Sequence, residues 1–155
     1  MARKNKYKIR LNVGDPKYKH VLIGQFINKV MLDGKKAKAE KLVYKALDLA
    51  AKQGSEDPVK LFESAIQNAS PKMHVKSKRV GGATYQVPVE ISQEKAAALS
   101  IKWIIEFSRK RKGKAFEEFL SQELVDAFNN TGSALKKKEE VHKMAESNRA
   151  FSHYR

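Results

Sequence analysis

VKSKRVGGATYQVPVEI, Val75 to Ile91, interrupts a chain whose other segments carry the periodicity of helices. Apolar residues alternate with polar or basic residues on both sides of the pair Gly81-Gly82, and such alternation is typical of strands. The two glycines tolerate the positive backbone angles of a tight turn. Pro88 cannot donate to an inner ladder, which suits an edge strand. The segment therefore predicts a two-stranded β-hairpin arm, and we expect its outer part to need a partner to become ordered.

Three helices are predicted before the arm. Apolar residues recur at steps of three and four from His20 to Leu32 and again from Lys36 to Gly54. Asp57 can cap free backbone amides, and Pro58 suits a first helical turn, so a third helix begins there.

Three further helices are predicted after the arm. Ser92 is a good N-cap for a helix so apolar that we expect it to be the central one. A fifth helix lies between Phe116 and Phe128, and a last one runs from Ala134 to Asn148. The fold class is therefore mainly α, a single domain of about six helices with a protruding two-stranded β-hairpin and a basic N-terminal extension. Its expected divisions are the basic extension 1–19, helices over 20–70, the hairpin 72–91, helices over 92–148 and a C-terminal tail 149–155.

The charge balance constrains the partner. The chain has 155 residues, with 32 lysines and arginines against 17 aspartates and glutamates, a formal net charge of +15. Self-repulsion of this size destabilises a compact state unless a polyanion neutralises it, so nucleic acid or an anionic membrane surface is the expected partner. No apolar run approaches the ~20 residues that span a bilayer, and no cysteine is present for disulfides or thiolate chemistry. We expect a soluble, unprocessed protein.

The first twenty residues form a basic segment. Its lysines and arginines outnumber a single acid, Asp15, and Gly14 and Pro16 interrupt any helix. We expect this extension to lack fixed structure until it binds a partner. A tail that stays solvated and disordered is the alternative.

No constellation of catalytic residues is evident. Four histidines, at positions 20, 74, 142 and 153, stand far apart, and none has a second metal ligand beside it at helical spacing. The glycine pair is not a phosphate loop, because no Gly-Lys-Ser or Gly-Lys-Thr follows and the chain enters a strand there. We expect no enzymatic activity, no metal and no cofactor, and we interpret each histidine as a surface or RNA-facing residue.

Basic side chains gather in four groups, which folding would bring onto one or two faces. On the hairpin, they make a narrow rod that can lie along a phosphate backbone, and Tyr85 offers a ring for stacking. A charged edge that only prevents aggregation is the alternative. Lys95, Lys102 and Arg109 are spaced by seven and fall on one stripe of the fourth helix. The side chains predicted to contact RNA are Arg3, Lys4, Lys6, Arg10, Lys35, Lys36, Lys72, Lys76, Lys78, Arg79, Lys95, Lys102, Arg109, Arg111, Lys112 and Lys114.

Lysine predominates over arginine, and phosphate contacts position a protein without reading sequence. We therefore expect recognition of the shape of a folded nucleic acid. A helical body with a basic ribbon also fits an architectural DNA-bending protein, which remains the alternative function. Association with anionic membranes is a weaker third class, because the amphipathic helices turn their apolar faces towards one another. Trp103 could stack on a base, but on an apolar helix it is interpreted as a core residue.

Several long motifs resemble those of the family of bacterial-type small-subunit ribosomal proteins number seven. Val75 to Ile91 is similar to the family's hairpin motif, and MLDGKKAKAEKLVYKAL, Met31 to Leu47, resembles its early helix signature. KKKEEVHKMAESNRAFSHYR, Lys136 to Arg155, resembles its C-terminal sequence, and ALSIKWI lies in the central helix. The resemblance covers essentially the whole chain.

The resemblance implies a ribosomal role. Such a protein binds the 3′ major domain of small-subunit rRNA, nucleates assembly of the head, lies near the exit-site tRNA and the mRNA exit channel, and contacts neighbouring ribosomal proteins. It works in the ribosome, cytoplasmic or organellar, and no membrane partner or homo-oligomer is expected. Lys35, Lys36 and the basic hairpin strand match RNA-facing motifs of the family. Residues that it implies lie near tRNA or mRNA are Arg79, Gly81, Gly82, Ala83, Thr84, Tyr85, Arg149 and Tyr154.

One departure from the family pattern follows the hairpin. The family usually has several arginines there, whereas this chain reads SQEKAAAL, Ser92 to Leu99, with Glu94 among them. The expectation of RNA contact is accordingly weaker at Lys95 than at Lys78.

Overall fold

The structure, a computed structural model, describes residues 14–54 and 56–154. Over these residues the fold class is as predicted, because six α-helices accompany one two-stranded antiparallel sheet. A short C-terminal 3-10 helix, which the sequence did not predict, follows them. The elements are α1 (Val21–Val30), α2 (Lys36–Gly54), α3 (Pro58–Ala69), β1 (Met73–Val80), β2 (Ala83–Glu90), α4 (Gln93–Lys110), α5 (Phe116–Phe128), α6 (Ser133–Ser147) and η1 (Arg149–Tyr154).

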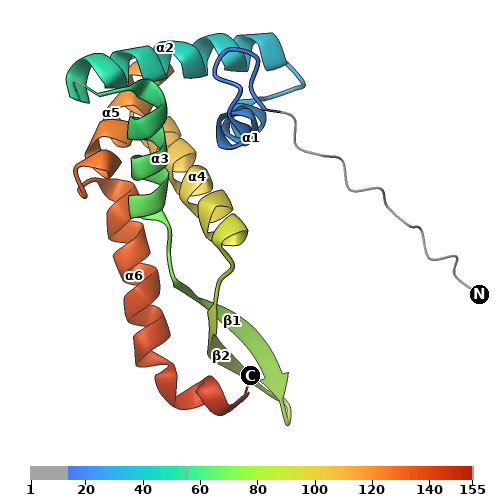
Figure 1. Cartoon of the computed structure of the whole chain (residues 1–155). Coiled ribbons are helices and arrows are strands. Elements are labelled where there is room, and N and C mark those ends of the chain that lie inside the picture. Colours follow the sequence, from blue (N-terminus) through green and yellow to red (C-terminus); the bar gives the residue numbers. More distant parts are fainter. Residues whose placement is uncertain (1–13, 55, 155) are drawn as a thin grey trace, which may run out of the picture.

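The hairpin projects from one end of the helical body (Figure 1). α2 lies across the opposite end, where it packs against α3 and α5. β1 follows α3 and β2 leads into α4, so the arm is an excursion of the chain between two packed helices. α6 runs from the body to the hairpin, where η1 and the C-terminal end lie beside the strands (Figure 1).

Two helix starts follow their predicted residues, but only one is capped by a side chain. The Asp57 carboxylate accepts a hydrogen bond from the backbone N–H of Val59 at 3.4 Å, and Pro58 opens α3. Ser92 is the residue before α4, as predicted, yet its side chain makes no capping hydrogen bond. The hydroxyl of Ser92 is therefore not used to start the helix.

The turn between α1 and α2 begins earlier than the periodicity indicated. α1 ends at Val30 and not at Leu32, because the chain leaves the helix at Met31, whose ψ angle is 134°. The backbone then takes positive φ angles at Asp33 and Gly34, 52° and 72°. A left-handed conformation suits glycine, so the Asp-Gly sequence redirects the chain into α2.

Residues 14–19 correct the expectation of an extension without fixed structure. Asp15 is buried, and its carboxylate accepts hydrogen bonds from the backbone N–H groups of Lys17 and Tyr18 at 3.0 and 2.9 Å. The Tyr44 hydroxyl on α2 donates to the same carboxylate at 2.5 Å. Burial and this carboxylate raise the pKa of Tyr44, so its hydroxyl remains a donor. Asp15, the single acid of this basic segment, therefore attaches residues 14–19 to α2.

The hairpin has the predicted turn and a regular register. Gly81 and Gly82 have φ angles of 58° and 89°, which fit the tight turn expected of a glycine pair. Val80 pairs with Ala83 beside the turn, and the ladder continues to Met73 opposite Glu90. Every residue of the eight-residue β1 has a partner in β2.

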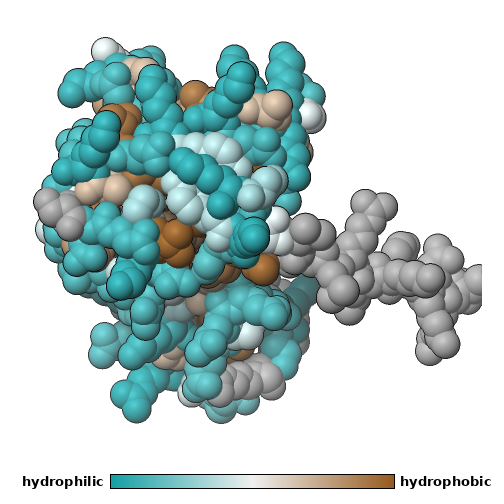
Figure 2. Space-filling model, turned by 45° about the horizontal axis from the view of Figure 1, so that its top comes forward, coloured by the Kyte–Doolittle hydropathy of each residue, from teal (hydrophilic) through white to brown (hydrophobic). Residues whose placement is uncertain are grey.

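The hydrophobic core lies between the helices, with α4 at its centre. α4 contacts α1, α3, α5 and α6, and it buries Ile101, Trp103, Ile104 and Ile105. Trp103 is 7% exposed, so the interpretation of this residue as core is confirmed. The face turned forward in Figure 2 is largely hydrophilic, with apolar atoms only in small separate areas. No helix in residues 14–54 or 56–154 is long and apolar enough to cross a bilayer.

Replacing Trp103 by alanine should destabilise the protein by about 3–5 kcal/mol, because the indole is buried in a helix that contacts four others. Urea unfolding followed by circular dichroism measures this loss. Lys102→Ala on the same helix is the matched control, since an exposed lysine contributes little to folding. Equal stability of the two variants would contradict the assignment of the indole to the core.

Candidate nucleic-acid interface

The C-terminal segment braces the hairpin from one side. The ring of Phe151 in η1 lies 5.3 Å from the ring of Tyr85 in β2, measured between centroids. Nε2 of His142 on α6 accepts a hydrogen bond from the backbone N–H of Lys72, just before β1, at 3.0 Å. Val87 of β2 is buried, although the sheet has only two strands. The C-terminal segment of the protein therefore holds the arm. One side of the half-buried Tyr85 ring lies against Phe151.

The strand register places the hairpin cations on both faces of the ribbon. Lys76 pairs with Val87 and Lys78 pairs with Tyr85, so these two lysines project from the same face as the apolar residues of β2. Arg79 pairs with Thr84 and belongs to the other face. All three cations are exposed. The predicted basic rod therefore presents positive charge in two directions near its tip.

A groove lies between the base of the hairpin and the start of α4, which we call the hairpin groove. Its volume is about 680 Å³. Apolar side chains make up much of its wall, and lysines from both elements stand on it. It is lined by His74, Val75, Lys76, Val89, Glu90, Ile91, Ser92, Lys95, Ala98 and Leu99. Folding has thus brought Lys76 and Lys95, nineteen positions apart in the sequence, to one site.

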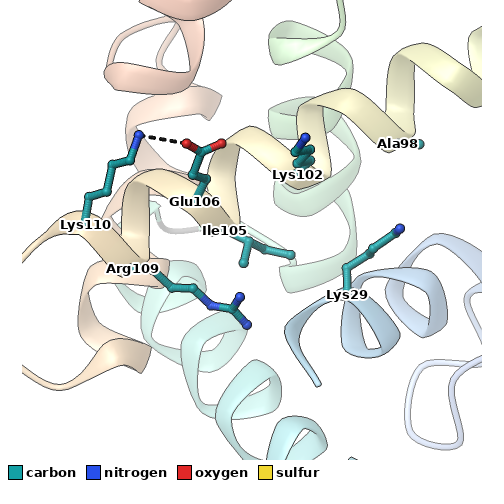
Figure 3. A pocket seen from close by; sticks show the side chains of 7 residues that line it. All are labelled: Lys29, Ala98, Lys102, Ile105, Glu106, Arg109 and Lys110. Carbon is teal, nitrogen blue, oxygen red and sulfur yellow. Dashed lines mark ion pairs between the residues drawn. The ribbon is translucent and has the colours of Figure 1, made fainter. Parts of the chain in front are cut away.

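A second hollow, the α1–α4 cleft, continues along α4. It has a volume of about 430 Å³ and is lined by Lys29, Ala98, Lys102, Ile105, Glu106, Arg109 and Lys110. Figure 3 shows the side chain of Lys29 extending from α1 and that of Lys102 from α4 on the two sides of the cleft. The Lys110 ammonium pairs with the Glu106 carboxylate at 2.7 Å, and this pair lowers the pKa of Glu106. The predicted stripe of cations on α4 therefore faces a cation from α1.

The two hollows form one basic track, because Ala98 lines both of them. None of the ion pairs in the described part of the chain involves Lys29, Lys76, Lys95 or Lys102. All four side chains are exposed, so their charge is open to solvent and to a bound polyanion. Phosphate groups laid along this track would meet lysines from β1, α4 and α1 in succession.

Arg109 also serves the fold. Its guanidinium donates a hydrogen bond to the backbone carbonyl of Val30 at 3.0 Å, across the end of the cleft. Val30 is the last residue of α1, where carbonyl groups lack partners within the helix. Arg109 therefore links the end of α1 to the end of α4, while its contact with RNA stays a prediction.

Arg111 is held by two acids of α5. Its guanidinium pairs with Glu123, which is completely buried, and with Asp126 at 3.3 Å. Burial raises the pKa of Glu123, and the charge of Arg111 opposes that shift. Gly132 closes over this cluster, since a Cβ at its position would lie 2.8 Å from Cβ of Asp126. Arg111 thus anchors the loop between α4 and α5, and its guanidinium is not a free cation.

The other predicted residues lie elsewhere on the molecule. Lys35 and Lys36 are exposed at the start of α2, and Lys112 and Lys114 are exposed on the α4–α5 loop. Arg149 and Tyr154 lie in η1, beside β2. The predicted contacts of the N-terminal extension, from Arg3 to Arg10, lie outside the described residues. RNA or tRNA contact by any of these residues remains a prediction.

The histidines are more engaged than predicted. His20 pairs with Glu63 at 2.7 Å, and His142 accepts the hydrogen bond from Lys72. His153 lies 2.8 Å from the carbonyl of Ala150 through Nδ1. No group of three or more histidines, cysteines, aspartates or glutamates suited to a metal occurs over residues 14–54 and 56–154.

One cation of the basic track, Lys29, was not found from the sequence, where it is the only charged residue of α1. His74, which also lines the track, was interpreted as a surface or RNA-facing residue. Lys29 lies in the last turn of α1, which was the one available signal that it could project beyond the helix towards a neighbouring element. Its position opposite Lys102 depends on how α1 packs on α4, which periodicity does not give.

Comparisons of the sequence with known proteins give matches over nearly the whole chain. The family described as "Ribosomal protein S7p/S5e" matches residues 2–149 of the chain. The "Small ribosomal subunit protein uS7" of Herpetosiphon aurantiacus is 52% identical over 154 residues, which cover 99% of this chain and 98% of that protein. The protein of the same name from Thermotoga petrophila is 48% identical over 153 residues, with 99% of each chain covered. That from Nitratidesulfovibrio vulgaris is 51% identical over 155 residues, covering 100% of this chain and 99% of its own.

Replacing Arg111 by alanine should destabilise the fold by about 3 kcal/mol, because it leaves the buried Glu123 carboxylate without its cation. Thermal unfolding measures the change. Lys112→Ala, on the same loop but exposed, should leave the melting temperature nearly unchanged. A melting temperature for Arg111→Ala equal to that of Lys112→Ala would contradict the anchoring role.

Acidification should weaken the attachment of α6 to the hairpin. Burial, followed by the charges of Lys138 and Lys72, lowers the pKa of His142 below its ordinary value of 6.5. Between the lowered and the ordinary pKa the unfolded chain binds more protons than the folded one, so stability falls as pH falls through that interval. A protonated ring also cannot accept the hydrogen bond from Lys72.

Urea unfolding between about pH 8 and about pH 5 tests this dependence, since histidine changes charge in that range. His142→Gln is the matched variant, because glutamine keeps an acceptor but does not titrate. The stability of the variant relative to the original protein should rise as pH falls. A difference that stays constant over the whole range would show that His142 does not titrate on unfolding in this way.

Proposed function

The chain belongs to the ribosomal protein S7p/S5e family, and on that basis we propose which of its surfaces binds rRNA and which neighbours it meets. As a member it is a small-subunit ribosomal protein that binds rRNA, and it is not an enzyme. The RNA surface is the basic track from Lys76 through Lys95 and Lys102 to Lys29. The observation that carries this proposal is the absence of any internal ion pair on these lysines in residues 14–54 and 56–154.

The proposed ligand is the 3′ major domain of small-subunit rRNA. Folded RNA concentrates phosphates in the close-packed arrangement that a row of uncompensated lysines neutralises, and each neutralised phosphate releases counterions. Binding at this domain would make the protein a nucleus for assembly of the subunit's head. The hairpin supports the assignment because it carries cations on two faces and could separate two RNA segments.

The tip of the hairpin is proposed to lie near the exit-site tRNA and the mRNA exit channel. Gly81 and Gly82 have no side chains, so the backbone there can approach another molecule closely. A Cβ at either position would find nothing within 4 Å, so no other part of the described chain fills the space beside the two glycines. η1, with Arg149, lies beside β2 and would belong to the same surface.

A transcript of the 3′ major domain should bind the purified protein far more tightly than duplex DNA of equal length at moderate salt. The affinity should fall steeply as salt rises, because lysine–phosphate contacts displace counterions. Filter binding over a salt series measures both affinities. Equal affinities would favour the alternative, an architectural DNA-binding protein.

The triple variant Lys76→Ala, Lys78→Ala, Arg79→Ala should weaken RNA binding and reduce the salt slope by about two to three. Its melting temperature should stay close to the original, because the three side chains are exposed. Lys45→Ala is a matched control, since this lysine pairs with Glu117 on a surface away from the track. A large fall in melting temperature would instead assign the three residues a structural role.

A further inference from the structure

The hairpin groove is more apolar than phosphate binding requires. Val75, Val89, Ile91 and Leu99 line it and are only half-buried. Ala98, also in the lining, has a small side chain that leaves the space unfilled. A volume of about 680 Å³ lies in the range of sites that hold small organic groups. Apolar surface of this kind offers nothing to a phosphate, but it can cover the flat face of a ring.

Cations stand beside this apolar surface, together with one acid, Glu90. Lys76 from β1 and Lys95 from α4 are exposed and line the same groove, and His74 pairs across the ladder with Val89. A nucleotide combines an apolar face, a polar edge and a phosphate on either side. The arrangement of an apolar wall with flanking lysines is complementary to that combination, and it is not complementary to an uncharged apolar peptide.

A polar group for the edge of a base is also present. Ser92 precedes α4 but makes no capping hydrogen bond, and its side chain lines the groove. Serine at this position ordinarily bonds to the first turn of its helix. Here the hydroxyl has no hydrogen-bond partner within the described part of the chain, so it is available as donor or acceptor to a ligand.

We propose that the hairpin groove holds one unstacked base of a single-stranded rRNA segment, with its flanking phosphates on Lys76 and Lys95 and the Ser92 hydroxyl on its edge. The inference rests on the proposed function, because it takes the ligand to be rRNA. Unstacked bases are held in this way between apolar side chains with hydrogen bonds to their edges. From Ala98 the strand continues into the α1–α4 cleft, where Lys102 and Lys29 meet the next phosphates.

Two conservative variants test the groove without removing charge. Val89→Thr keeps the shape of the side chain but places a hydroxyl against the base, and Ser92→Ala removes the edge contact. Each should lower affinity for the 3′ major domain transcript by roughly 3-fold to 10-fold, the value of one ordinary hydrogen bond. The salt slope should not change, because no phosphate contact is lost. The melting temperature of Ser92→Ala should also be unchanged, since no capping bond is removed.

Matched controls separate this effect from others. Val80→Thr makes the same chemical change at the last residue of β1, next to the turn and outside the groove. This variant should bind RNA like the original protein. Lys76→Ala should lower the salt slope by about one, as expected for a lost phosphate contact. The contrast between an unchanged slope and a reduced slope distinguishes base contact from phosphate contact.

Chemical probing of the RNA identifies the base. With the original protein, at least one unpaired base should be protected from a reagent that attacks base edges, and Val89→Thr should restore its reactivity while backbone protection persists. The inference would be overturned if Val89→Thr and Ser92→Ala both bound RNA as tightly as the original protein, or if they lost affinity with a reduced salt slope. It would also be overturned if the groove proved necessary only for binding another ribosomal protein. Failure of the original protein to bind the transcript would instead overturn the proposed function.

Discussion

Repulsion among like charges is the constraint on which the rest of this structure depends. The chain carries 32 cations and 17 acids in 155 residues, so the position of each acid decides which cations are neutralised. On the helical body, Asp48 pairs with Lys17, Glu117 with Lys45, and Glu123 with Arg111. Within the basic track, Glu106 pairs with Lys110, whereas Lys29, Lys76, Lys95 and Lys102 make no ion pair in the described residues. These unpaired lysines keep their positive charge for a polyanion such as RNA.

The hairpin is the part of the molecule that local forces explain least. An isolated two-stranded ribbon is marginal in water, and this one contains a buried valine, Val87, with no third strand to cover it. The cover comes from the C-terminal segment, through the contact of Phe151 with Tyr85 and the hydrogen bond to His142. The arm and the C-terminal segment therefore form one unit. A change that loosens α6 would alter the direction of the arm without touching any RNA contact.

Sequence patterns predicted the elements well and their mutual placement poorly, for a physical reason. The period of apolar residues, the Asp57-Pro58 start and the glycine pair are local signals, and each produced the element expected of it. Asp15 was taken for an isolated acid because its partner, Tyr44, is distant in sequence. The ion pairs of Arg111 were not predicted, because the acids that hold it lie on the next helix, and its contact with RNA stays a prediction. A list of basic residues cannot tell which are already paired, since pairing is decided by packing.

The two arginines of the helical body point to the source of specificity. Arg111 binds buried carboxylates, and the exposed Arg109 donates one hydrogen bond to a helix end, where a planar group with several donors is most useful. Apart from Arg109 and His74, the cations of the track are lysines, which bind phosphate as point charges and distinguish one RNA sequence from another very little. Charge can therefore supply affinity and speed of association, but discrimination among RNAs must come from shape. The shapes of the α1–α4 cleft, which the Arg109 hydrogen bond spans at one end, and of the hairpin groove are the features that would provide it.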